Sequence, residues 1–301
     1  MAAQIRIGTS GWHYKHWCGP FYPKKCPSSQ WFELYARLFD TVEVNNTFYR
    51  LPTEDAVRNW HDAAPRKFCF SVKASRFITH VKRLRDPADA ISLFFSRVEL
   101  LRSKLGSILF QLPPRWHVDP ERLADFLPAL PRGHQYVFEF RDESWNTPAI
   151  FDLLWRHKIA LCIHDWRGSQ SPMELTADFT YIRFHGATGK YQGNYGEPFL
   201  SNWAERIKGW AAHLSHIYAY FNNDEHGYAV NNAQTLQHLL NRELSRAAYV
   251  CSPPLKPLSN KMCEIVLQQH VSRITGSDGS SVSLRLSMLQ RLKRAKGQDR
   301  R

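Results

Sequence analysis

The chain has 301 residues, of which 43% are hydrophobic, so it can bury the core of one large domain or two small ones and is not a disordered polypeptide. The formal net charge is +13, and residues 241–301 alone carry twelve Lys and Arg against four Asp and Glu. This charge favours polyanionic partners in general but says nothing about the fold. The sequence has no apolar run of membrane-spanning length, no secretion-signal pattern and no CxxC pair, which together predict a soluble, cytoplasmic protein.

Short β-type runs alternate with helical patterns through most of the chain. The predicted strands are residues 5–8, 41–44, 68–73, 107–111, 136–141, 160–165, 181–185 and 217–222. Eight strands that alternate with helices are typical of a single (β/α)8 TIM-type barrel in the α/β class. An open, doubly wound sheet is the weaker alternative, because GTSGWHY after the first strand lacks the glycine spacing of a dinucleotide-binding loop.

Capping residues mark the starts of four predicted helices. Thr53 precedes two acidic residues, and Asp86, Asp119 and Thr147 each precede a proline, which suits the first helical turn.

Two segments depart from this alternation. RGSQSPMELTA, between the sixth and seventh strands, is too polar to form a regular helix, so the sixth helix is predicted to be reduced. After residue 245 the sequence becomes loop-like and then basic. We therefore predict a barrel over residues 1–245 and a basic, partly helical or disordered extension over residues 246–301.

Polar side chains recur at the carboxyl ends of the predicted strands. Residues two apart share one face of a strand, which pairs Glu43 with Asn45, for example, while the apolar Val44 between them faces the other way. The other polar strand-end residues are Ser71, Lys73, Gln111, Glu139, Arg141, Asp165, Arg183, His185, Asn222 and Asn223. In a barrel these side chains point inward at the rim, where TIM-type proteins place their active sites. A network of buried ion pairs that braces the rim is the structural alternative.

Seven motifs resemble one known family. They are GTSGWHYKHWCGPFYP, VEVNNTFYR, FCFSVKASRFITH, FQLPPRW, FEFRDESW, YIRFHG and YFNND, and together they are similar to the YecE-like family, domain of unknown function 72, over residues 5–240. The resemblance implies a TIM-type barrel and no particular reaction. It places family motif positions at Ser10, Trp12, Tyr14, Glu43, Asn45, Phe48, Tyr49, Lys73, Thr79, His80, Gln111, Glu139, Arg141, Trp145, Arg183, His185, Gly186 and Asn223.

The main functional hypothesis is recognition, extending to hydrolysis, of an anionic phosphate-bearing ligand such as a nucleotide, a sugar phosphate or a nucleic acid. Arg and Lys bind phosphate oxygens. The candidate ligand-binding residues are Ser10, Trp12, Tyr14, Asn45, Tyr49, Lys73, Gln111, Arg141, Trp145, Arg183, Tyr191, Tyr195, Asn222 and Asn223. The candidate catalytic residues are Glu43 and Glu139 as bases, His185 and His80 as acids, and Asp165.

Three alternatives stay open. A metal-dependent phosphodiesterase or nuclease would use the rim His and carboxylates for a divalent ion, although three nearby cations oppose a metal cluster. A glycoside hydrolase would use Glu43 and Glu139 as its carboxylate pair. A non-catalytic nucleic-acid-binding module would bind its ligand at the rim without turnover. No resident cofactor is predicted, and the sequence does not determine the oligomeric state.

The first loop contains His13, His16, Cys18 and Cys26. Their spacing matches no common zinc module, so we interpret them as unrelated loop residues and predict no metal site there.

Overall fold

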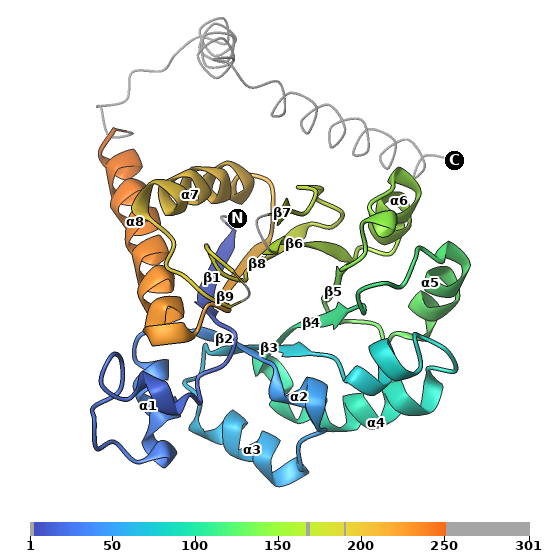
Figure 1. Ribbon diagram of the computed structural model, residues 1–301, viewed down its shortest axis with the longest axis horizontal. Coiled ribbons are helices and arrows are strands. Elements are labelled where there is room, and N and C mark those ends of the chain that lie inside the picture. Colours follow the sequence, from blue (N-terminus) through green and yellow to red (C-terminus); the bar gives the residue numbers. More distant parts are fainter. Residues whose placement is uncertain (1–2, 167–168, 190, 251–301) are drawn as a thin grey trace, which may run out of the picture. The chain divides into compact units, whose positions relative to one another are not determined.

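The computed structural model describes residues 3–166, 169–189 and 191–250 (Figure 1). The chain divides into two units, Met1–Arg242 and Glu243–Arg301, and the barrel lies in the first unit. Most of the predicted basic extension, residues 251–301, lies outside the described residues. No helix among the described residues is long and apolar enough to cross a membrane.

Eight parallel strands form a nearly closed barrel, as predicted (Figure 1). In spatial order they are β1 (Gln4–Thr9), β9 (His216–Phe221), β8 (Phe179–Phe184), β6 (Ala160–Trp166), β5 (Tyr136–Glu139), β4 (Leu105–Gln111), β3 (Cys69–Lys73) and β2 (Thr41–Val44). Every predicted strand is present, with ends that differ from the prediction by at most two residues.

The gap between β1 and β2 is closed by side-chain contacts. Tyr35 of the first helix accepts a hydrogen bond from the Thr9 amide at 3.0 Å and donates one to the Thr41 carbonyl at 3.0 Å. The two strands lie so close that a Cβ at Gly8 would stand 2.4 Å from the Thr41 carbonyl oxygen. Glycine at position 8 is therefore required for the ring to close.

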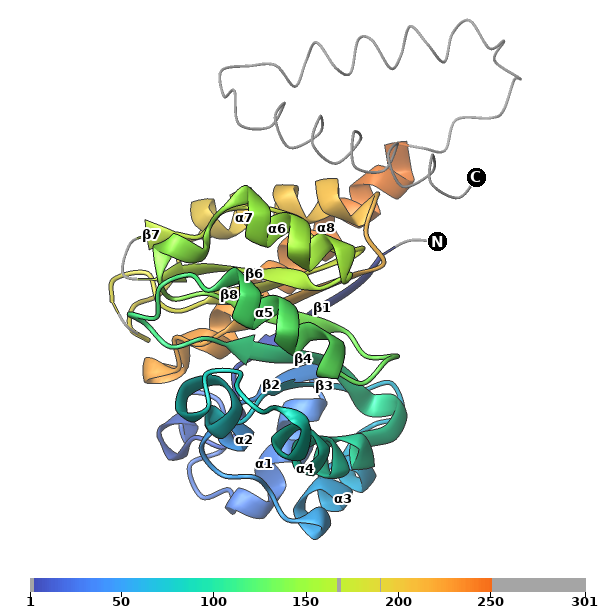
Figure 2. The same ribbon diagram turned by 90° about the vertical axis from the view of Figure 1, so that its right-hand side faces the viewer.

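Helices surround the strands on the outside (Figures 1 and 2). They are α1 (Trp31–Ala36), α2 (Asn46–Tyr49), α3 (Glu54–Ala63), α4 (Ala88–Val98), α5 (Pro120–Phe126), α6 (Pro148–Arg156), α7 (Glu197–Ala211) and α8 (Tyr228–Val250). Thr53, Asp119 and Thr147 cap α3, α5 and α6 through their side-chain oxygens, as predicted. The predicted Asp86 cap is wrong, because the N-cap position of α4 falls on Pro87, which has no side-chain acceptor.

The connection from β6 to β8 follows the prediction of a reduced sixth helix. A short strand, β7 (Ser169–Gln170), turns back and pairs with β6 in antiparallel fashion. Residues 171–178 that follow are irregular.

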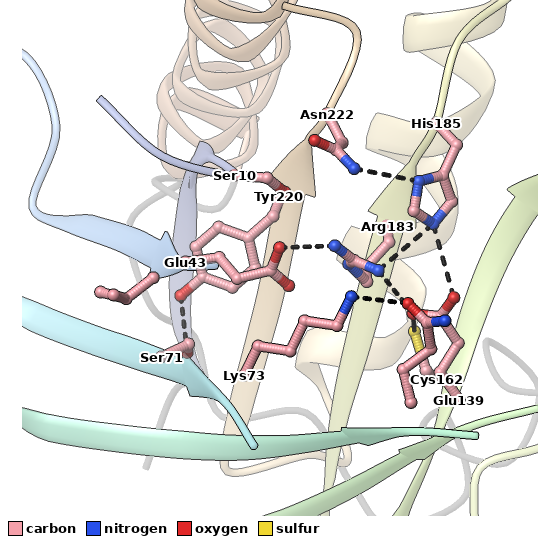
Figure 3. Close-up of polar contacts among 12 residues, drawn as sticks. Ser10, Glu43, Ser71, Lys73, Glu139, Cys162, Arg183, His185, Tyr220 and Asn222 are labelled. Carbon is pink, nitrogen blue, oxygen red and sulfur yellow. Dashed lines mark hydrogen bonds and ion pairs between the residues drawn. The ribbon is translucent and has the colours of Figure 1, made fainter. Parts of the chain in front are cut away.

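The barrel interior is a packed core with an unusual number of polar atoms. Apolar and aromatic side chains from most of the strands fill it, among them Leu109, Val137 and Tyr181. Hydroxyl groups bond to one another within this core: Tyr220 lies 2.6 Å from Thr41 Oγ1 and 2.8 Å from Ser71 Oγ. Ser71 is in register with Glu43 and lies two residues before Lys73 on β3, so these hydroxyls adjoin the charged residues at the carboxyl ends of the strands (Figure 3).

Candidate functional site

Arg183 is the centre of a buried charged cluster at the carboxyl end of the barrel (Figure 3). It comes from β8, is 1% exposed, and donates to Glu43 Oε1 at 2.7 Å and to Glu139 Oε2 at 2.6 Å. The second Glu43 oxygen accepts a hydrogen bond from the Tyr181 hydroxyl at 2.6 Å. One guanidinium therefore joins β2 and β5 across the barrel.

The charges in this cluster are fixed. Burial alone would raise the pKa of Glu139, but Arg141 and Arg183 outweigh burial and hold that pKa well below its usual range. Burial would lower the pKa of Arg183, but Glu43 and Glu139 raise it well above its usual value. The buried ion-pair network that was considered as a structural alternative is thus present. Two Nη atoms of Arg183 are engaged by carboxylates of the protein and do not face an open ligand site.

Arg141 and His185 extend the network toward the rim. Arg141 pairs with Glu139 through its Nε, and its Nη2 lies 2.8 Å from His185 Nε2. Because a guanidinium can only donate, the imidazole Nε2 accepts this hydrogen bond. Burial, with Arg183 and Arg141 nearby, holds the pKa of His185 well below its usual range. His185 is therefore neutral at neutral pH and cannot begin a reaction as an imidazolium acid.

His80 is also neutral at neutral pH. It follows β3, and its ring lies edge-on to Phe48 with 5.0 Å between ring centroids. Burial, aided by Lys73, lowers the pKa of His80 to about 4. The predicted role of general acid therefore fits neither of the two histidines.

Lys73 differs from the other two cations of the cluster. It ends β3, is 8% exposed, and donates to Gln111 Oε1 at 2.6 Å. Its Nζ also lies 4.1 Å from the centroid of the Phe48 ring. Within the described part of the chain no carboxylate pairs with it, and burial, followed by the charge of Arg183, lowers its pKa to about 7.

Several buried polar atoms near the carboxyl ends of the strands have no hydrogen-bond partner among the described residues. They are Ser10 Oγ, Asn45 Oδ1, His164 Nδ1, Arg183 Nε and Asn223 Oδ1. Buried polar atoms are nearly always bonded to protein, water or a ligand. Donors and acceptors from β6, β8 and the segments that follow β1, β2 and β9 are thus available to a bound molecule.

Asp165 and Tyr195, a predicted catalytic and a predicted ligand-binding residue, do not join the inward cluster. Asp165 accepts from the His185 amide at 2.5 Å and from the Tyr195 hydroxyl, which in turn accepts from the Gly186 amide at 2.7 Å. The pair therefore holds the loop after β8. Asn223 supports the same loop, because its Nδ2 donates to the Gly193 carbonyl at 2.8 Å.

The predicted aromatic wall is only partly present. Trp145 is fully buried, is stacked on Phe140 and donates to the Trp116 carbonyl, so its ring cannot stack on a ligand. Trp12 is likewise buried, against Phe32 and Trp60.

Three tyrosines remain near the rim. Tyr14 donates to the Ser10 carbonyl at 2.6 Å. Tyr191 lies 5.9 Å from His185 between ring centroids, and Tyr49 is 79% exposed. Of the predicted aromatic wall, Tyr49 and Tyr191 are therefore available for contact with a ligand at the mouth of the barrel.

His164 was missed at the sequence level. The prediction took Asp165 as the polar end of β6, but Cys162 and His164 are the residues in phase with the interior, and His164 is in register with Arg183. His164 Nε2 donates to the Phe140 carbonyl at 3.1 Å, which leaves Nδ1 as an acceptor. Strict two-residue alternation from Cys162 would have found it.

The candidate metal ligands do not assemble. The described residues contain no group of three or more His, Cys, Asp or Glu side chains that could hold a metal ion. Glu43 and Glu139, which the phosphodiesterase hypothesis requires, are engaged by Arg183. In the first loop, His16 Nε2 lies 2.8 Å from the Asp224 carbonyl oxygen, and Cys26 lies near Gln30.

The fold and the cluster define a TIM-type barrel whose strands end in a buried, charged polar network. Residues 6–257 match the model of the family described as "Protein of unknown function DUF72", and the chain belongs to that family. This confirms the YecE-like resemblance of its motifs.

Proteins of similar sequence and solved structures of similar fold support the family assignment. The UPF0759 protein YunF of Bacillus subtilis is 27% identical over 81% of this chain and 97% of its own length. The UPF0759 protein YecE of Escherichia coli is 34% identical over 36% of this chain and 40% of its own length. The crystal structure of a DUF72 family protein from Thermotoga maritima superposes with a TM-score of 0.72 at 28% identity, covering 79% of this chain and 99% of that one. A DUF72 family protein from Enterococcus faecalis, at 19% identity over 85% of this chain and 99% of that one, shares the fold with a TM-score of 0.70.

Proposed function

We propose that the carboxyl end of the barrel binds an anionic, phosphate-bearing small molecule. The observation that carries the proposal is Lys73, a buried cation that no carboxylate neutralises within the described residues. Burial of an unpaired charge is unfavourable, so a protein that keeps one at the carboxyl end of a barrel strand has a reason other than stability.

The charge balance supports an anion. The largest charge effects on the pKa of Lys73 come from Glu139 and Glu43, which favour its protonated form, and from Arg183 and Arg141, which oppose it. The carboxylates and guanidiniums cancel, so protonated Lys73 leaves one positive charge in excess. A bound phosphate group supplies the missing negative charge and accepts hydrogen bonds from Lys73.

Binding is better supported than hydrolysis. His185 and His80 are neutral at neutral pH, and Glu139 is a weak base because its pKa lies well below the usual range. A glycoside hydrolase needs a protonated carboxyl group as its acid, which Glu139 does not provide. Because only 8% of the Lys73 surface is exposed, a small anion fits this position better than a nucleic acid chain.

Calorimetric titration with glycerol 3-phosphate tests the proposal on the full chain. Lys73→Met removes a charged hydrogen bond, which is worth about 1.5–3 kcal/mol, so we expect affinity to fall roughly 10- to 150-fold. The matched control is Lys82→Met, which removes the same charge from a more exposed side chain that faces Asp86. Equal affinity in the wild type and in Lys73→Met would refute the proposal.

A further inference from the structure

The geometry around Lys73 points to chemistry beyond binding. We propose that Lys73 is a nucleophile that condenses with the carbonyl group of a small phosphorylated aldehyde or ketone to form an imine. The inference rests on the proposed function, because the phosphate group is what brings the carbonyl compound to the rim.

Lys73 is mounted on a rigid part of the barrel. Its own carbonyl accepts a hydrogen bond from Thr47 Oγ1 at 2.7 Å, and the next amide, of Ala74, donates to the Leu109 carbonyl at 2.8 Å. The side chain then crosses the mouth of the barrel toward Glu139 and Arg183 (Figure 3). A nucleophile held on a strand keeps a defined position relative to a bound ligand.

The contacts of Lys73 suit a neutral amine. Its Nζ has one hydrogen-bond acceptor, the amide oxygen of Gln111, and the face of Phe48 lies on another side. An ammonium group would direct one N–H to Gln111 and a second to the Phe48 ring, and would leave the third without an acceptor in the described structure. An amine has a lone pair in place of that third N–H. Lys104 provides the contrast: it is equally exposed, at 8%, but donates to two backbone carbonyls, those of His61 and Ala64.

The electrostatics act in the same direction. Burial, Arg183 and Arg141 lower the pKa of Lys73, while Glu139 and Glu43 raise it, and the balance lies at about 7. His80, whose pKa the charge of Lys73 helps to lower to about 4, is neutral at that pH. A pKa lowered to about 7 makes the unprotonated amine, which is the state that attacks a carbonyl carbon, accessible at neutral pH.

The reaction balances without any oxidant or further reactant. The amine nitrogen forms a bond to the carbonyl carbon, and the carbonyl oxygen takes up a proton lost by nitrogen, which gives a carbinolamine. Loss of the hydroxyl group and the second nitrogen proton as water then gives the imine. Protonation of the imine by solvent restores the positive charge that faces Glu43 and Glu139.

Reductive trapping tests the inference. The protein is incubated with dihydroxyacetone phosphate and sodium borohydride, and the intact mass and peptide map are measured. We expect one adduct per chain, located at Lys73, that forms in Lys104→Met and is absent in Lys73→Arg, with circular dichroism to verify folding. Below pH 7 the trapping rate is expected to fall about tenfold per pH unit, as the amine becomes protonated. Adducts spread over many lysines, or none at Lys73, would overturn the inference.

Glycerol 3-phosphate separates this inference from the proposed function, because it differs from dihydroxyacetone phosphate only in having an alcohol in place of the ketone. It is expected to bind and to suppress trapping. Binding of glycerol 3-phosphate with no trapping of dihydroxyacetone phosphate refutes the imine and leaves the binding function standing. Failure of both ligands to bind refutes both.

Discussion

Replacement of Lys73 by Met is expected to stabilise the protein at acidic pH. Met has nearly the same length and no charge to bury. The pKa of Lys73 lies at about 7 instead of its ordinary 10.5. At about 1.4 kcal/mol per pH unit, this shift corresponds to roughly 5 kcal/mol of destabilisation by the protonated side chain. Gln111 loses its hydrogen-bond donor in the variant, which opposes the gain by about 1–3 kcal/mol. A net stabilisation of roughly 2–4 kcal/mol remains.

The pH dependence follows from the sign of the shift. Between pH 7 and 10.5 the unfolded chain binds more protons at this position than the folded chain, so wild-type stability rises with pH across that window. The destabilisation is complete below pH 7 and has vanished by about pH 10.5. Urea denaturation of both proteins at pH 6 and pH 10 is therefore expected to show the largest difference at pH 6.

Lys104→Met is the matched control for this experiment. Lys104 is equally buried, but its amine satisfies the carbonyls of His61 and Ala64 at the end of α3. Its replacement leaves two acceptors without a donor, so this variant is expected to be less stable than the wild type at both pH values. If Lys73→Met is destabilised at pH 6 to the same extent as Lys104→Met, the reasoning about Lys73 is wrong.

Two further substitutions test the framework around Lys73. Arg183→Met leaves Glu43 buried without a cation and leaves Glu139 with Arg141 alone, so denaturant titration at pH 7 is expected to show a loss of about 3–5 kcal/mol. The loss should shrink at acidic pH, where the orphaned Glu43 carboxylate becomes protonated, and a pH-independent loss contradicts the ion-pair account. Gly186→Ala places a Cβ 2.4 Å from the Gly189 carbonyl oxygen at a residue with φ +128°. We expect thermal denaturation to reveal a loss of at least about 1–3 kcal/mol, and an unchanged melting temperature would show that the loop after β8 is not held as described.

The strand-end rule predicted much of the site because it depends only on the two-residue alternation of a strand. Glu43, Lys73, Glu139 and Arg183 point into the barrel as expected, since each lies in a regular strand whose neighbouring residues are apolar. The rule went wrong at β6, where Asp165 was taken as the inward residue. Ala160 and Cys162 of that strand lie in the core, so two-residue alternation places His164, and not Asp165, in phase with the interior.

The partners of these residues could not be predicted in the same way. Glu43 and Arg183 are 140 positions apart in the sequence and meet only because the barrel closes. The sequence also could not predict which way the side chains of loop residues point. Trp145 matched a family motif and lies just after β5, yet its ring packs on Phe140 and not toward a ligand. A motif identifies a residue that the fold requires, but it does not state which way the side chain points.

The ion pairs around Lys73 help to determine its protonation state. Arg183 binds Glu43 and Glu139, and Arg141 pairs with the other oxygen of Glu139. These ion pairs form a rigid charged network next to Lys73. Hydrophobic residues of similar volume in place of this network would make the protein at least as stable. Burial and the fixed charges of the network, however, set the protonation state of the Lys73 amine. Because Lys73 titrates near neutrality, a bound anion draws it toward the charged form, and a carbonyl compound consumes the neutral form. At saturating ligand, carbonyl trapping should rise as the pH approaches 7 and level off above it, whereas anion affinity should fall above pH 7. The two profiles identify which protonation state each process uses.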